Sequence, residues 1–284
     1  MALLFVVFGV FLAICTGCNG FSEEPPAQAS KANSPKYKIG VEEKSSISEG
    51  VASQLPKAQI KHYPDLITAY FALQVGDIDI LAYDENVLTH TFNDSMSGLT
   101  YIENDIDVPN EFVIAMNKHS SIPDLKGIIN RLIDSLNAAG TLTELNEHWN
   151  KNLKTNPLIS TKESDSEQIL RIATSADVPP FSFMSGNQIV GLDVDIAKLL
   201  EEKLNIKTSI IKMDRNKLVT ALKNNDADLI ISAFTICECL RHEIDYSKPY
   251  FIGKTTFAIR NDFDKEATLC KVPKMTYLEP KKPE

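Results

Sequence analysis

Short apolar strands alternate with amphipathic helices twice along this chain, first in residues 37–153 and again in residues 169–261. The expected strands are KYKIGV, QIKHY, DIDILAYD and EFVIAMN in the first stretch, and ILRIATS, KTSIIKM and ADLIISAF in the second. Strands separated by helices form βαβ units, whose strands pair mostly in parallel. The sequence therefore predicts an α/β protein of two lobes, each a mostly parallel sheet with flanking helices.

The segments outside these two stretches lack the alternation. Residues 1–18 carry an apolar run that is shorter than the roughly 20 residues of a membrane span, as in a signal peptide. The run is followed by a lipobox-like sequence that ends in Cys18, the expected site of lipidation. An uncleaved anchor or plain secretion is the alternative. Residues 19–36 are polar and contain Pro and Ser, as in a flexible tether. Residues 154–168 are predicted as a linker and 262–284 as a poorly ordered tail.

Charge and residue types exclude several functions. The formal net charge of -9 repels nucleic acid and anionic membranes, so neither is an expected partner. The five histidines are scattered, and we find no nucleophile elbow or Gly-rich phosphate loop, so we predict no catalytic residue, metal or cofactor. Outside the leader, Cys237, Cys239 and Cys270 do not make an even disulfide framework, and the first two are only two residues apart. We therefore expect unpaired thiols.

Specific motifs appear in the second stretch. RIATSADVPPFSFM, GLDVDIAKLLEEKLN, ALKNNDADLIISAFTI and RHEIDYSKPYF, between Leu170 and about Asn261, resemble the first lobe of the family 3 extracellular solute-binding proteins, the polar-amino-acid receptors of ABC importers. YKIGVEEKSSISEG, AYFALQVGDIDILAYDENVL and LKGIINRLIDSLNAAGTLTELNEHW resemble that family's second lobe and terminal helices. The resemblance implies a two-lobe, periplasmic-binding-protein-like fold with its lobes in reversed order.

Two explanations of the reversed order stay open. The chain is either a circular permutant of one binding protein or a slice through a tandem pair. Residues 37–261 are about one family domain in length, and permutation is tolerated where termini lie close. We favour one composite fold, in which the two stretches dock within the chain.

The resemblance also implies ligand contacts from the first stretch. Asp84 matches the family's ammonium-binding acid, with a helix N-cap as the alternative role. Ser45 and Ser46 match a turn that offers hydroxyl and N–H groups to an anion, again with capping as the alternative. The family often has Gly where Lys44 stands, so this turn is an expected point of difference.

In the second stretch, Phe181 and Phe183 match the family's aromatic wall, with a core position as the alternative for one of them. Asp177 is expected at the edge of the cleft, and Ser232 is a candidate contact on the strand ADLIISAF.

One departure from the family concerns the ligand's carboxylate. Counting back from the hinge residues DYS puts Cys237 at the family's Thr position and Leu240 at the position of its carboxylate-binding arginine, so that guanidinium is missing. Arg241 lies one residue later and replaces it only if the backbone shifts. The implied fold is kept, whereas the ligand class is left open.

Together these features predict an exported, lipid-anchored solute-binding protein at the periplasmic face or cell surface. It would capture a small, amino-acid-like solute between its lobes for the membrane permease of an ABC importer. A ligand-sensing domain of a signalling system and a degenerate, non-binding remnant of a tandem protein are the alternatives; an enzyme is not expected.

Overall fold

The computed structural model describes residues 37–92, 98–104, 106, 108–151, 158–159, 164–262 and 275–277 of the 284-residue chain. The chain divides after Ser34, and every described residue lies in the part that follows. The predicted leader, Cys18 and the tether therefore lie outside the described residues. No helix among the described residues is both long enough and apolar enough to cross a membrane.

The first stretch contains five strands and five helices within its described residues. They are β1 (Lys38–Glu42), α1 (Ser46–Gln54), β2 (Gln59–Tyr63), α2 (Leu66–Gln74), β3 (Ile80–Asp84), α3 (Glu85–Thr91), β4 (Leu99–Asn104), β5 (Pro109–Asn117), α4 (Leu125–Ala138) and α5 (Thr141–Lys151). The strands predicted from KYKIGV, QIKHY, DIDILAYD and EFVIAMN are thus confirmed.

The second stretch repeats the alternation with a further set of elements. They are β6 (Ile169–Thr174), β7 (Asp177–Val178), β8 (Ser182–Ser185), β9 (Gln188–Val190), α6 (Leu192–Leu204), β10 (Lys207–Lys212), the 3₁₀ turn η2 (Arg215–Lys217), α7 (Leu218–Lys223), β11 (Leu229–Ile230), the 3₁₀ turn η3 (Glu238–Leu240) and β12 (Ile244–Arg260).

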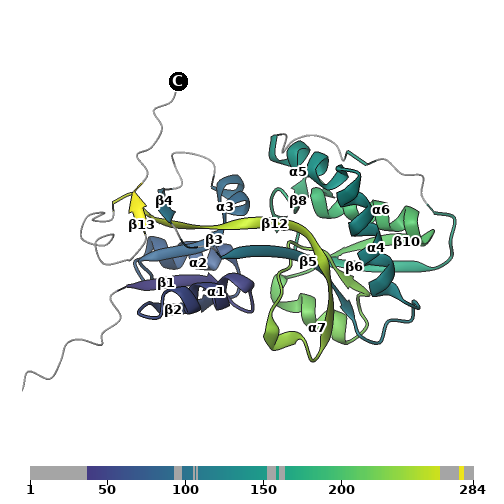
Figure 1. Ribbon diagram of the computed structural model, residues 1–284, viewed down its shortest axis with the longest axis horizontal. Helices are drawn as coiled ribbons and strands as arrows, with labels where there is room; N and C mark the ends of the chain where they lie inside the picture. Colours follow the sequence, from purple (N-terminus) through teal and green to yellow (C-terminus); the bar gives the residue numbers. More distant parts are fainter. Residues whose placement is uncertain are drawn as a thin grey trace, which may run out of the picture. The chain divides into compact units, whose positions relative to one another are not determined.

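Strands from both stretches join one mixed sheet, in the order β10-β6-β11-β5-β12-β3-β1-β2. Pairing is parallel at the two ends, where β1 lies between β2 and β3 and β6 lies between β10 and β11. In the centre, β5 and β12 run antiparallel to each other along most of the length of β5 and lie side by side in Figure 1. The predicted α/β class is confirmed, and the central antiparallel strands make the sheet mixed.

The two stretches share their largest core. Trp149 at the end of α5 is fully buried, and it lies in one cluster with Leu170 and Ile172 of β6 and Leu192 of α6. The helices α4, α5 and α6 pack against one another beside this part of the sheet (Figure 1). Burial of these side chains, at about 25 cal/mol per Å² of apolar surface, holds the stretches together.

One described segment differs from the expected unordered tail. Residues Met275–Tyr277 form β13, which pairs antiparallel with β4. The physical reason is that the edge of β4 away from β12 has backbone donors and acceptors free for another strand.

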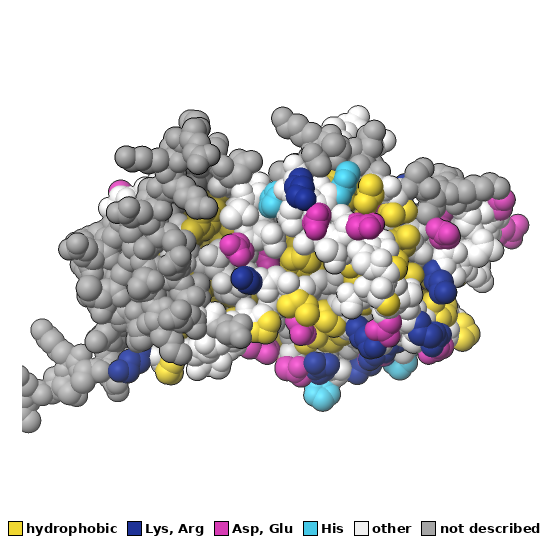
Figure 2. Space-filling model, turned by 45° about the horizontal axis from the view of Figure 1, so that its top comes forward, with side chains coloured by type: hydrophobic (Ala, Val, Ile, Leu, Met, Phe, Trp, Pro, Cys, Tyr) yellow, Lys and Arg dark blue, Asp and Glu magenta, His cyan; other side chains and the backbone are white. Residues whose placement is uncertain are grey.

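The acidic net charge is not gathered in one place on the face shown in Figure 2. Acidic and basic side chains are interspersed over that face, and apolar ones appear between them. Such a mixed surface gives no strong field of one sign there.

Candidate functional site

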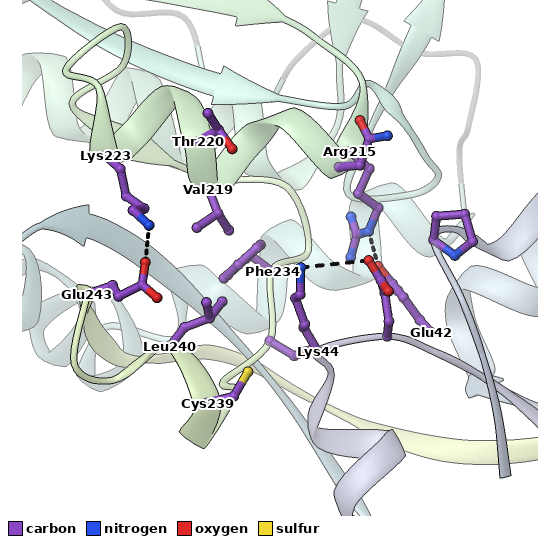
Figure 3. Close-up of a pocket in the computed structure, with 14 residues that line it drawn as sticks. Glu42, Lys44, Arg215, Val219, Thr220, Lys223, Phe234, Cys239, Leu240 and Glu243 are labelled. Atoms are coloured by element: carbon purple, nitrogen blue, oxygen red, sulfur yellow. Dashed lines mark hydrogen bonds and ion pairs between the residues drawn. The ribbon is translucent and has the colours of Figure 1, made fainter.

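A pocket with a volume of about 390 Å³ opens among strand ends and loops of both stretches (Figure 3). It is lined by Glu42, Glu43, Lys44, Pro64, Arg215, Asn216, Val219, Thr220, Lys223, Phe234, Thr235, Cys239, Leu240 and Glu243. Glu42 is the last residue of β1, and Arg215 follows β10 closely. Open α/β sheets bind ligands beyond the carboxyl ends of their strands, and the volume is typical of a small-molecule site.

An ion pair between the two stretches forms one wall of the pocket. The Nε of Arg215 donates to Oε1 of Glu42, and the two side chains are only 11% and 12% exposed. Figure 3 shows Arg215 pointing at Glu42. On the other side, Oε2 of Glu42 accepts a hydrogen bond of 2.5 Å from the hydroxyl of Tyr83. Each oxygen of the Glu42 carboxylate therefore has a donor.

The surroundings of Glu42 keep Arg215 charged and Tyr83 neutral. Burial acts to lower the pKa of Arg215, but the negative charge of Glu42 and the hydrogen bond to it outweigh burial and raise the pKa above its usual range. Burial and the charge of Glu42 raise the pKa of Tyr83 well above its usual value. Arg215 therefore remains a cation and Tyr83 a neutral donor at any physiological pH.

Asp84, the predicted ammonium-binding acid, acts as the N-cap of α3 in this structure. Its Oδ1 accepts from the N–H of Val87 at 3.1 Å, and its Oδ2 accepts from Nδ2 of Asn110 at 3.2 Å. The residue is fully buried against β12, where a Cβ on Gly253 would lie 2.1 Å from Oδ2. Burial raises the pKa of Asp84 to about 6. Its side chain does not line the pocket.

The serine turn also caps a helix and reaches the second stretch. Ser45 is the N-cap of α1, and its hydroxyl accepts from the N–H of Ser48 at 3.2 Å. Ser46 donates its hydroxyl to Asn110 Oδ1 at 3.1 Å and its N–H to Oγ1 of Thr235 at 3.3 Å. The space beside this network is only about 10 Å³, enough for about one water molecule.

The predicted point of difference at Lys44 has a backbone basis. Its φ is +55°, in the left-handed region that glycine adopts without strain. A lysine accepts that conformation at some cost, and its side chain lines the pocket, as seen in Figure 3. The turn therefore keeps a glycine-like backbone while adding a cation to the site.

The expected aromatic wall packs elsewhere. Phe181 is fully buried and meets Phe112 and Phe251 edge-on at centroid distances of 4.6 and 4.9 Å. Phe183 is half-buried and lies edge-on to Trp149 at 5.9 Å. Neither lines the pocket, so a core role accounts for both contacts in this structure. Asp177 is exposed on β7, and its negative charge contributes to raising the pKa of Arg215.

Ser232 is fully buried and supports Arg215. Its hydroxyl lies 2.9 Å from that of Ser175, and its carbonyl oxygen accepts from Nη1 of Arg215 at 2.9 Å.

The expectation of unpaired thiols is wrong for Cys237 and Cys239, which form a disulfide. Two residues of separation allow this bond because Cys237 is extended before the turn η3, and the Cα atoms lie 5.2 Å apart.

Leu240 and Arg241 lie in different surroundings. Leu240 is buried and lines the pocket, whereas Arg241 is exposed, pairs with Glu238 at 2.6 Å and lies over the ring of Tyr246. Arg241 lines another hollow, beside α1. In this structure the one-residue offset therefore keeps Arg241 out of the pocket. The guanidinium that does line the pocket belongs to Arg215.

Sequence reasoning missed Glu42, Tyr83 and Arg215. Their signal was position: Glu42 is the last residue of β1, Tyr83 is the last but one of β3, and Arg215 follows β10 closely. All three strands run to the edge of the sheet at which such folds bind ligands. Within the described residues, no group of three or more His, Cys, Asp or Glu is arranged to hold a metal ion.

Comparison with known proteins gives a family match over the second stretch and a short segment beyond it. Residues 170–275 match the family of bacterial extracellular solute-binding proteins, family 3. The chain is 34% identical over 103 residues to the arginine-binding extracellular protein ArtP of Bacillus subtilis, a match that covers 36% of this chain and 40% of that protein. It is 27% identical over 98 residues to a probable histidine-binding protein of Campylobacter jejuni, covering 34% of this chain and 38% of the relative.

The chain thus spans less than half the length of these curated relatives. Among solved structures, the arginine-bound form of domain 1 from TmArgBP is 32% identical, with 38% of this chain and 92% of that one covered and a TM-score of 0.30. The family and both relatives are named for binding a solute, and none for a reaction. Residues 170–275 of this chain therefore belong to the bacterial extracellular solute-binding proteins, family 3.

Proposed function

We propose that this chain is an exported solute-binding protein that captures a small, amino-acid-like solute and delivers it to the permease of an ABC importer. The observation that carries the proposal is the pocket of about 390 Å³, which residues of both stretches line at the carboxyl ends of β1 and β10. Closure of two lobes around such a site excludes water from the ligand. The names of the relatives, for arginine and histidine, support an amino-acid ligand.

Two finer points belong to the same proposal. Lipidation at Cys18 would hold the protein at the outer side of a membrane, with residues 19–36 as its tether. The two stretches would represent the lobes of one receptor in permuted order. Their shared sheet and the buried contacts of Trp149 beside β6 and α6 support this arrangement.

A ligand screen tests the proposal. The chain from Asn19 onward would be melted in the presence of each of the 20 amino acids, polyamines and small organic acids. A ligand at 100 times its dissociation constant adds about 2.7 kcal/mol to the free energy of unfolding, which raises the melting temperature by several degrees. Calorimetry on the same samples would give the affinity and a stoichiometry of one.

A matched pair of variants would place that ligand in the pocket. Thr220→Trp fills the pocket from the exposed side of α7 and should abolish the shift, whereas Glu202→Trp on the exposed side of α6 should leave it intact. A cooperative melt with no response to any compound would contradict solute binding and favour the degenerate remnant.

A further inference from the structure

The ion pair Glu42–Arg215 joins the two stretches, yet each partner is positioned by its own stretch. Glu42 accepts from Tyr83, which lies on β3 of the same stretch. Arg215 donates to the carbonyl oxygens of Ser232 at 2.9 Å and Ala233 at 3.4 Å, which follow β11 of the second stretch. A separation of the stretches would break the ion pair and leave both sets of supporting contacts in place.

The other charged groups lining this pocket pair locally. Lys223 pairs with Glu243 inside the second stretch, and Lys44 pairs with its neighbour Glu43 at 3.8 Å. All four side chains are at least 40% exposed. Exposed ion pairs contribute little to stability, because water solvates both partners when such a pair breaks. Glu42 and Arg215 therefore differ from the other ion pairs among the described residues of the pocket. They are the pair in which both side chains are largely buried and each comes from a different stretch.

The positions at which the family resemblance implied ligand charges are occupied differently here. Asp84 is fully buried and caps a helix, and Leu240 has no charge. Of the charged side chains that line the pocket, one acid (Glu42) and one guanidinium (Arg215) are largely buried, and each has a neutral supporting partner. The chemistry needed to recognise both ends of a zwitterion is therefore present at two other residues.

We propose that Glu42 and Arg215 are the charge-recognising residues for a zwitterionic amino acid, which inserts between them with its ammonium on Glu42 and its carboxylate on Arg215. This inference rests on the proposed function. In this structure the two residues pair with each other. A zwitterion supplies each with an opposite charge, so closure on it leaves no buried charge unpaired. A solute with only one of the two charges leaves one residue unpaired.

Charge-deleted analogues test the inference on the full chain in a mild detergent, by calorimetry at pH 8. The probes are L-histidine, histamine (no carboxylate) and imidazolepropionate (no ammonium), with L-arginine, agmatine and 5-guanidinopentanoate as a second set. At pH 8 the imidazole is neutral, so each analogue of the first set differs in one charge. We expect both analogues to bind at least about 30-fold more weakly than the parent amino acid.

Variants assign each charge to its residue. In Glu42→Gln the discrimination against the compound without an ammonium should fall to about 3-fold or less, and in Arg215→Met the same should hold for the compound without a carboxylate. The double variant E42Q/R215M buries no unpaired charge, so it keeps the test valid if a single variant does not fold. Arg171→Met and Glu147→Gln, outside the pocket, should leave every ratio unchanged.

The outcomes separate this inference from the proposed function. Two results would overturn the assignment while solute binding stands. One is an analogue without ammonium or carboxylate that binds as tightly as the parent amino acid. The other is a double variant in which the affinity ratios between parent and analogues are the same as in the unmodified protein. Absence of binding by both L-histidine and L-arginine overturns it as well; the wider screen then decides separately whether the chain binds any solute.

Discussion

The indole Nε1 of Trp149 donates a hydrogen bond of 2.8 Å to Oδ2 of Asp195, and both residues are fully buried. Trp149 lies in the last turn of α5, near the end of the first stretch, and Asp195 lies in the first turn of α6 in the second. The same carboxylate accepts from the N–H groups of Leu158 and Ile159, each at 3.2 Å. One side chain of the second stretch thus accepts hydrogen bonds from the end of the first stretch and from the connecting segment.

Removal of this acceptor should weaken the junction. Asp195→Ala leaves three donors without their acceptor, of which the indole N–H of Trp149 is buried and cannot turn to water. A buried unsatisfied group costs about 1–3 kcal/mol, so we expect a loss of about 1–3 kcal/mol in the free energy of unfolding. Urea denaturation followed by Trp149 fluorescence measures it. Asp165→Ala, on the exposed part of the connecting segment, should change it by less than about 0.5 kcal/mol. Equal effects of the two substitutions would argue against the junction.

Local patterns predicted the regular elements well. QIKHY forms β2 at the predicted residues, and the helix expected before Gly76 ends there, with the glycine at φ +78°. Asp84 and Ser45 form the caps that were one of their two expected roles. These features depend on neighbours within a few residues, which the sequence displays directly.

Features that depend on distant residues were not predictable. Glu42 and Arg215 are 173 positions apart, and nothing in either local sequence marks it as a partner of the other. The length of β12 could not be predicted, because Pro249 lies within it and a proline ordinarily argues against a strand interior. In the structure the pairing of β12 with β5 shifts register on both sides of Pro249. Phe181 matched a binding motif, yet its packing against Phe112 depends on how the two stretches meet.

A second prediction concerns pH. Burial raises the pKa of Asp193 from 3.8 to about 6, although Tyr250 and the N–H of Ala233 donate to it at 2.7 and 2.9 Å. Between about pH 4 and pH 6 the folded protein therefore holds a proton on Asp193 that the unfolded chain has released. Stability contributed by this group falls as pH rises through that window, by about 3 kcal/mol in total.

The comparison of parent and Asp193→Asn isolates this residue. The amide cannot titrate. The free energy of unfolding of the parent should therefore fall by about 3 kcal/mol relative to that of the variant between pH 4 and pH 6.5, and should not fall further above pH 6.5. The amide has one acceptor oxygen in place of two, which adds an offset that does not vary with pH. Asp84→Asn should behave alike, because burial raises the pKa of Asp84 to about 6 as well. An unchanged pH slope in Asp193→Asn would refute the assignment.

A third prediction concerns the disulfide between Cys237 and Cys239. Iodoacetamide added to the unfolded, unreduced protein should modify neither cysteine, and both should react after reduction; mass spectrometry of the peptide around η3 reads this out. Replacing both by serine should lower stability by about 1–2 kcal/mol, since the closed ring is very short. Labelling of either residue without reductant would show the bond to be absent in solution.

The last prediction concerns the cost of leaving Glu42 unpaired. The Glu42 side chain is 12% exposed, and Arg215→Met leaves it with the hydroxyl of Tyr83 as its remaining side-chain donor. Removing one partner of a buried ion pair costs about 3–5 kcal/mol, so we expect a loss of that size in urea denaturation. Arg131→Met breaks the exposed pair with Asp124, whose side chains are 63% and 64% exposed, and should cost less than about 1 kcal/mol.

The double variant E42Q/R215M decides whether pairing is the cause. If the loss arises from an unpaired buried charge, removal of both charges should restore about 2 kcal/mol or more relative to Arg215→Met alone. Simple additivity of the two single substitutions would instead mean that Arg215 stabilises the protein through its bonds to the carbonyl oxygens of Ser232 and Ala233. Because those carbonyls lie on the same stretch as Arg215, that result would also remove the ion pair as a link between the two stretches.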